Sequence, residues 1–148
     1  ISLINAHLSP NIDSNWHPDN RFVPFISSQL EQLALEINQL HKAGNAIILA
    51  CDLNTARDSF LYEMFVERAE LNDVFENDLH PTMHAELSRR GRQPRRLDYI
   101  FTRNAKKAAT SIKADYLFTE KVTFSSGKTD FLSDHIGLFA TVEFKEKH

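Results

Sequence analysis

The sequence predicts a layered fold of the α/β or α+β class, and three patterns support this prediction. Residues 46–51 form an uninterrupted apolar run, which is typical of a strand buried on both faces in the centre of a sheet. Residues 23–43 carry apolar side chains at helical spacing with Gln, Glu and Asn between them. Residues 111–118 and 136–145 alternate apolar and polar side chains, as half-buried strands do.

Local signals place the other elements in chain order. Residues 1–8 are predicted to be a strand, and the Pro-, Asn- and Asp-rich residues 9–20 a loop. Gly44 and Asn45 should end the first helix, while Asp58 or Ser59 can cap a second helix that runs to about residue 68. The remaining segments are predicted as follows: irregular connection over 70–83, a strand over 97–102, and a polar loop over 125–130.

Composition bounds the class of protein. With 148 residues and 42% hydrophobic side chains, the chain is predicted to be one globular domain, and no apolar run approaches the roughly 20 residues of a membrane span. The single cysteine, Cys51, is predicted to be a packed core thiol. Nothing in the sequence fixes the compartment. Because the strand pattern begins at Ile1 itself, we expect an amino-terminal portion to precede this chain.

Charge is divided unevenly along the chain. Residues 1–88 hold four basic and thirteen acidic side chains, whereas residues 89–148 hold thirteen basic and seven acidic ones. The second part is therefore suited to an anionic partner.

Polar side chains with potential acid, base or ligand chemistry occur at strand ends in four places. Taken alone, His7 or Asp98 is more easily explained as a hydrogen-bonded core residue or an ion-pair partner. The pair Asp52 and Asn54, directly after the apolar run, fits a turn and a functional site equally well, because it has two polar groups where a turn needs only one. A buried Asp52 carboxylate would also need a partner or a metal ion. The four places are His7, Asp52 with Asn54, Asp98, and Asp134 with His135.

Together these segments resemble the endonuclease/exonuclease/phosphatase superfamily, which has the DNase I-like fold. The segments that carry the resemblance are Asn5-Ala6-His7-Leu8, Cys51-Asp52-Leu53-Asn54, Leu97-Asp98-Tyr99-Ile100-Phe101 and Ser133-Asp134-His135-Ile136-Gly137-Leu138, in the family's order along the chain. The resemblance implies half of a four-layered α/β sandwich, with a mixed sheet flanked by helices. It also implies hydrolysis of a phosphate ester that depends on Mg²⁺, for which Mn²⁺ can substitute.

The resemblance also implies a role for each residue. His135 would be the general base that activates water, and Asp98 would orient its ring. Asp52 would position the nucleophile or protonate the leaving oxygen, and Asn54 would donate a hydrogen bond to a phosphate oxygen. Two further roles are implied: His7 would stabilise phosphoryl charge or assist the leaving group, and Asp134 would be a metal ligand or a neighbouring carboxylate.

Two departures from the family pattern affect these expectations. Cys51 stands where the family usually has Gly. The family's first half, with the Glu that is its main Mg²⁺ ligand and an Asn, has no counterpart here, so the chain resembles the carboxyl half of the domain. Without the other half the exposed sheet face could cause self-association.

A basic segment over 89–96 precedes the Asp98 strand and is predicted to contact substrate phosphates through Arg95 and Arg96; the alternative is a solvated loop.

The substrate could be nucleic acid, a phospholipid head group or a phosphorylated sugar, and the motif arrangement favours sphingomyelinase-like and general phosphodiesterase members. A competing hypothesis is a catalytically incomplete binding module that holds an anionic partner. An upstream metal-ligand Glu would distinguish the two.

Overall fold

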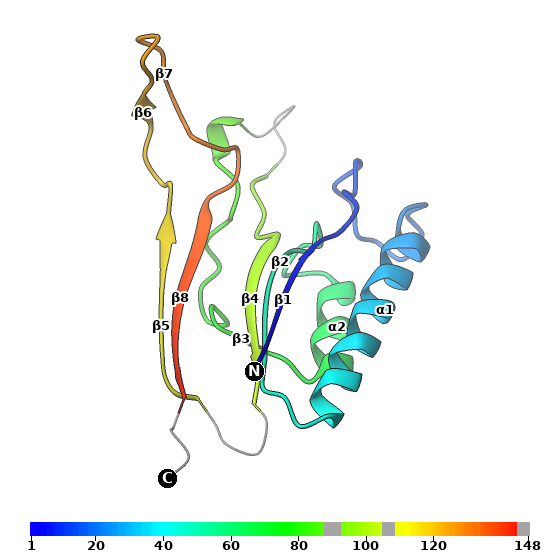
Figure 1. Ribbon diagram of the computed structural model, residues 1–148. Helices are drawn as coiled ribbons and strands as arrows, with labels where there is room; N and C mark the ends of the chain where they lie inside the picture. The colour runs from blue at the N-terminus through cyan, green and yellow to red at the C-terminus, as the bar shows by residue number, and fades with distance from the viewer. Residues whose placement is uncertain (88–92, 105–108, 145–148) are drawn as a thin grey trace.

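The computed structural model describes residues 1–87, 93–104 and 109–144, and its main feature is a four-stranded mixed sheet (Figure 1). The strand order is β1-β2-β4-β3, with β1 parallel to β2, and with β2 and β3 each antiparallel to β4. The strands are β1 (Ser2–His7), β2 (Ile47–Asp52), β3 (Asn72–Asp73) and β4 (Asp98–Arg103). The predicted mixed sheet with flanking helices is confirmed.

Two helices cover one face of this sheet (Figure 1). Helix α1 (Val23–Lys42) turns Ile26, Leu30 and Ile37 inward, as its apolar spacing predicts, and the chain leaves it through Gly44 at a φ of 89°. Helix α2 (Phe60–Ala69) begins at Ser59, whose side chain accepts a hydrogen bond from the backbone N–H of Tyr62. A short 3₁₀ turn, Ala85–Leu87, follows later in the chain.

A second, two-stranded antiparallel sheet lies on the other side of the first (Figure 1). It pairs β5 (Ala109–Leu117) with β8 (Gly137–Phe144), and β8 contacts β4. Between them is a hairpin whose short strands are β6 (Val122–Thr123) and β7 (Thr129–Asp130). The polar loop predicted over 125–130 forms the turn of this hairpin, except that its last two residues belong to β7. No helix within the described part of the chain is long and apolar enough to cross a membrane.

Burial alternates along β2, so the prediction of a strand buried on both faces is wrong for the described chain. Ile47, Leu49 and Cys51 point toward the helices and are buried, whereas Ile48, Ala50 and Asp52 point away from them and keep partial exposure. The physical reason is that both helices pack on one side only. The pKa of the buried Cys51 thiol is raised well above its usual value by burial, as expected for a core thiol.

Candidate active site

Strand register places three of the predicted residues in one row across the sheet. His7 of β1 is paired with Asp52 of β2, and Asp52 is paired with Asp98 of β4. Residues in register on neighbouring strands project to the same face, which here is the face without helices. Three segments that are distant in sequence thus present polar side chains at one end of the sheet, on the same face.

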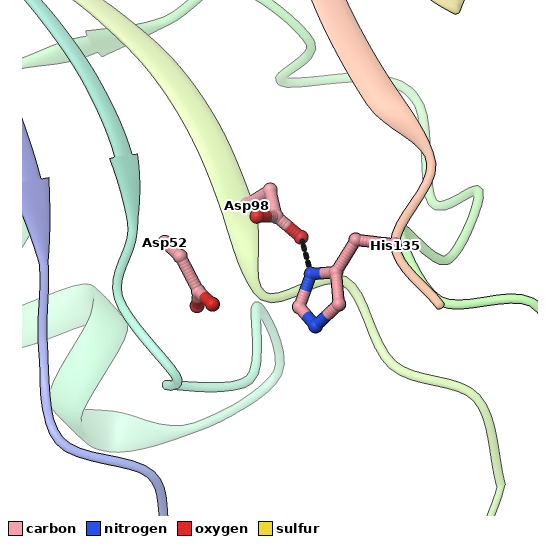
Figure 2. Close-up of side chains that lie close together, drawn as sticks. All are labelled: Asp52, Asp98 and His135. Atoms are coloured by element: carbon pink, nitrogen blue, oxygen red, sulfur yellow. Dashed lines mark hydrogen bonds and ion pairs between the residues drawn. The ribbon is translucent and has the colours of Figure 1, made fainter. Parts of the chain in front are cut away.

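His135 joins this row from the segment just before β8 (Figure 2). Its Nδ1 lies 2.7 Å from Oδ2 of Asp98, and its backbone N–H donates to the Ser133 hydroxyl oxygen. The hydrogen bond that the His135 ring donates to Asp98 is the main cause that raises the pKa of His135 to about 9, although partial burial opposes it. The ring is therefore fixed with Nδ1 toward Asp98 and Nε2 directed away from it.

Asp52 lies beside this pair in an electrostatically unfavourable position. Burial, and then the negative charge of Asp98, raise the pKa of the Asp52 carboxyl above its usual value. The backbone N–H of Asn54 donates to its Oδ1 at 2.7 Å, and Nε2 of His7 lies 3.5 Å from its Oδ2. The His7 side chain is itself 73% exposed, so that contact is open to solvent.

Asn54 supports the end of β2 in the structure. Its backbone has a φ of 49°, a left-handed conformation that Asn tolerates better than most residues. Its side-chain amide donates to the carbonyl of Leu8 at 2.9 Å, and its own carbonyl accepts from the Trp16 indole N–H. These contacts bear out the turn interpretation, and hydrogen bonding to a phosphate oxygen stays a prediction.

The substrate-binding prediction is wrong for Arg96. Its side chain is only 2% exposed, and the guanidinium donates to Asp73 Oδ1 at 2.6 Å and to the carbonyls of Phe75 and Asp78. A guanidinium committed to those three acceptors is a structural group. Arg95 instead pairs with Asp58 at the surface and stays a predicted substrate contact. The rest of the basic segment, residues 89–92, lies outside the described residues.

Asp52, Asp98 and His135 could hold a divalent cation, since one ligand atom of each lies within 4.8 Å of the others. Nδ1 of His135 is already engaged by Asp98. The oxygen ligands for a cation would therefore come from the carboxylates of Asp52 and Asp98. Mg²⁺ is commonly bound through one or two carboxylates while it keeps several waters. A cation here would also relieve the repulsion between Asp52 and Asp98, so the donor set fits Mg²⁺ or Mn²⁺. Asp134, predicted as a ligand, is exposed and outside this group, and its ligand role stays a prediction.

An open cavity of about 330 Å³ adjoins the row. Besides the predicted site residues, its lining includes Asn5, Phe118 and Gly137. Asn5 and Gly137 belong to the segments that carry the family resemblance, although neither was predicted as a site residue, and a Cβ at position 137 would come within 2.9 Å of the Phe118 ring. Phe118 was missed because a lone Phe in an alternating strand pattern carries no functional signal.

Comparison with solved structures identifies the fold. A truncated TDP2 from Caenorhabditis elegans superimposes with a TM-score of 0.66 and 17% sequence identity, over 95% of this chain and 53% of that one. An endonuclease/exonuclease/phosphatase family protein from Bacteroides thetaiotaomicron gives a TM-score of 0.59 with 18% identity, over 96% and 49% of the two chains. The chain has the endonuclease/exonuclease/phosphatase fold.

Beta toxin from Staphylococcus aureus, in a F277A, P278A mutant with bound magnesium ions, also matches this fold. Its TM-score is 0.65 at 18% identity, and the match covers 93% of this chain and 51% of the toxin. The chain thus spans about half the length of these three structures. No protein-family profile matches the chain. No curated protein matches it either.

Proposed function

We propose that this chain carries the water-activating half of a metal-dependent phosphoester hydrolase. The observation that carries the proposal is the Asp98–His135 pair, with Nδ1 and Oδ2 at 2.7 Å, placed beside Asp52 at the mouth of a cavity. A histidine oriented by a carboxylate, with its other ring nitrogen free for a water molecule, is the arrangement of a general base. The fold and the magnesium-bound toxin neighbour support the same class of reaction.

Each residue has a defined task in this proposal. Nε2 of His135 takes a proton from the attacking water, while Asp98 holds the ring and stabilises the imidazolium that forms. Asp52, in register with Asp98, would position the attacking water, and the leaving oxygen would take its proton from solvent water. His7, within 3.5 Å of Asp52, would stabilise charge on the phosphoryl group. Mg²⁺ held by Asp52 and Asp98 would supply charge neutralisation at the phosphoryl oxygens.

The proposal places the rest of the metal site outside this chain. The described residues offer two carboxylates at the row, fewer oxygen ligands than a stable Mg²⁺ site usually has. Because the chain covers about half of its structural neighbours, a second α/β unit against the exposed part of the helix-free face, at β1, would contribute the remaining ligands. The substrate is a phosphodiester or phosphomonoester, with sphingomyelinase-like and phosphodiesterase members of the fold as the preferred comparison.

A second candidate function is a binding module that holds an anionic partner without turnover. The observation that favours it is this incomplete set of oxygen ligands. It predicts binding that weakens as salt concentration rises and that is insensitive to chelators.

The test is hydrolysis of bis(p-nitrophenyl) phosphate and p-nitrophenyl phosphate by this chain and by the longest native polypeptide that contains it. We expect turnover with Mg²⁺ that EDTA abolishes, and a loss of about 10²- to 10⁴-fold in His135→Gln, the range for removal of a general base. His41→Gln, at the end of α1, is the matched control and should retain the wild-type rate. Undiminished turnover in His135→Gln would exclude the proposed base, and salt-sensitive binding without turnover would favour the binding module.

A further inference from the structure

Thr82 is a fully buried residue between the two segments that carry Asp98 and His135. Its exposed fraction is 0%, and it lies in the connection between β3 and β4. The connection was predicted to be irregular, and a single Thr within it carries no sequence signal. Its hydrogen bonds, however, reach the backbone of Asp98 and the backbone of Ile136, the residue after His135.

On one side, Thr82 binds the start of β4. Its hydroxyl oxygen accepts from the backbone N–H of Leu97 at 3.0 Å and of Asp98 at 3.1 Å. Its own N–H donates to the carbonyl of Arg95 at 3.1 Å. Three bonds from one residue therefore fix the backbone from which the Asp98 carboxylate projects.

On the other side, Thr82 binds the segment that carries His135. Its carbonyl accepts from the N–H of Ile136 at 2.8 Å, and the next residue, Met83, forms a bridge with His135. The N–H of His84 then donates to the carbonyl of Asp134 at 3.0 Å. Residues 82–84 thus run antiparallel to 134–136, and the residue that anchors Asp98 also anchors His135.

This shared anchor matters because the two side chains belong to different sheets. Asp98 begins β4, His135 precedes β8, and they are separated by 37 residues in the chain. Their 2.7 Å contact depends on the relative position of the two backbones. A displacement of about 1 Å at such a pair can cost on the order of 100-fold in rate.

We propose that Thr82 is a positioning residue that sets the geometry of the Asp98–His135 pair through its hydroxyl oxygen and its carbonyl. It does not touch the cavity or the reacting atoms, and acts through the two backbones. The proposal rests on the proposed function for its catalytic consequence, but the geometry of the pair can be measured separately.

The experiment compares Thr82→Val, which keeps the shape but removes the oxygen acceptor, with Thr82→Ser, which keeps the acceptor. Thr102→Val is the matched control, because Thr102 is also buried but lies near the far end of β4. The structural measurement is the NMR resonance of the His135 Nδ1 proton, assigned by its absence in His135→Gln, together with hydrogen exchange at the Asp98 and Ile136 amides. The kinetic measurement is kcat and KM for the phosphoester that the wild type hydrolyses.

In Thr82→Val we expect the Nδ1 proton resonance to broaden or shift and the two amides to exchange at least about 10-fold faster. We expect kcat to fall by about 10- to 100-fold with KM little changed. Thr82→Ser should restore all of these, and Thr102→Val should leave them at wild-type values. If no preparation has phosphoesterase activity, the proposed function fails but the NMR comparison still tests the anchor.

Three results would overturn the proposal. The first is an unchanged Nδ1 resonance with unchanged amide exchange in folded Thr82→Val. The second is equal disturbance by Thr82→Val and Thr82→Ser, which would point to the methyl group and packing. The third combines two observations: Thr82→Val does not fold, and Thr82→Ser folds but lacks the wild-type Asp98–His135 contact. That result would show that Thr82 serves the packing of the core and not the geometry of the pair.

Discussion

The two faces of the four-stranded sheet differ in what they contribute to the molecule. On the helix face, Leu49 is paired with Phe101 and Cys51 with Tyr99, and all four side chains are buried under α1 and α2. On the opposite face, β1, β2 and β4 carry the row from His7 through Asp52 to Asp98, and Leu3 of β1 is 74% exposed. The stability of the chain should come mainly from the first face and its chemistry from the second.

The difference shows why the site can tolerate groups that oppose folding. Asp52 and Asp98 are neighbouring carboxylates, and burial raises the pKa of Asp52 further. Such a pair costs free energy that the helix face must offset. Mutations that remove helix-face contacts should therefore destabilise the chain, whereas removal of the Asp52 charge should stabilise it.

The largest effect on stability is expected for Arg96→Met, at the edge of the helix-face core. This change leaves the buried Asp73 carboxylate without its close ion-pair partner and should lower the free energy of unfolding by about 3–5 kcal/mol. Arg95→Met removes only a surface pair with Asp58 and should cost no more than about 1 kcal/mol. Urea titration measures both. Equal costs would contradict the assignment of Arg96 as a structural residue.

Neighbouring residues of β2 allow the two faces to be compared directly. Leu49→Ala should lower the free energy of unfolding by about 2–5 kcal/mol, because it leaves a cavity under the helices. Ile48→Ala, on the partly exposed face, should cost less than half as much in this chain. The same titration in the longest native polypeptide tests whether a second unit covers this face: if it does, the cost of Ile48→Ala will rise toward that of Leu49→Ala.

The Asp98–His135 pair should make stability depend on pH above neutrality. The pKa of His135 is raised from about 6.5 to about 9, so the pair's contribution is fully present below about pH 6.5 and is lost as pH rises through 9. The linked change is at most about 3 kcal/mol. Urea titrations between pH 6 and pH 10 should show this loss in wild type and its absence in Asp98→Asn. Parallel curves for the two proteins would show that the pair does not form.

The smallest effect is expected for Asp52→Asn, and its sign is the informative part. Because the folded-state pKa of Asp52 is raised, the ionised carboxyl destabilises the fold at neutral pH, and this penalty disappears as pH falls. The amide should raise the melting temperature at pH 7 by a few degrees and leave it unchanged near pH 3. Metal-dependent turnover should be lost at the same time. A lower melting temperature at pH 7 would contradict the electrostatic description of the row.

The sequence allowed much of the fold and most of the site to be predicted. Apolar spacing located α1, and the Ser59 cap located the start of α2, because both signals are local. The row of His7, Asp52 and Asp98 followed from motifs at strand ends, and the register of the sheet brings those ends together.

The errors arose where an outcome depends on distant parts of the chain. Arg96 looked like the rest of its basic segment, and only the tertiary position of Asp73 makes it structural. The run over β2 predicted burial on both faces, but the helices cover one. Thr82 was missed because its importance lies in hydrogen bonds to the backbones of two segments that are distant from it in sequence. None of these features is encoded in local periodicity or composition.

In the proposed mechanism His135, oriented by Asp98, activates water for attack on a phosphate ester. The decisive measurement is the rate of Mg²⁺-dependent hydrolysis of bis(p-nitrophenyl) phosphate as a function of pH, for wild type and His135→Gln in the longest native polypeptide. We expect the wild-type rate to rise with pH as His135 loses its proton, and the rate of His135→Gln to be about 10²- to 10⁴-fold lower and to lack that step. A His135→Gln protein with the wild-type rate and the wild-type pH profile would exclude His135 as the general base.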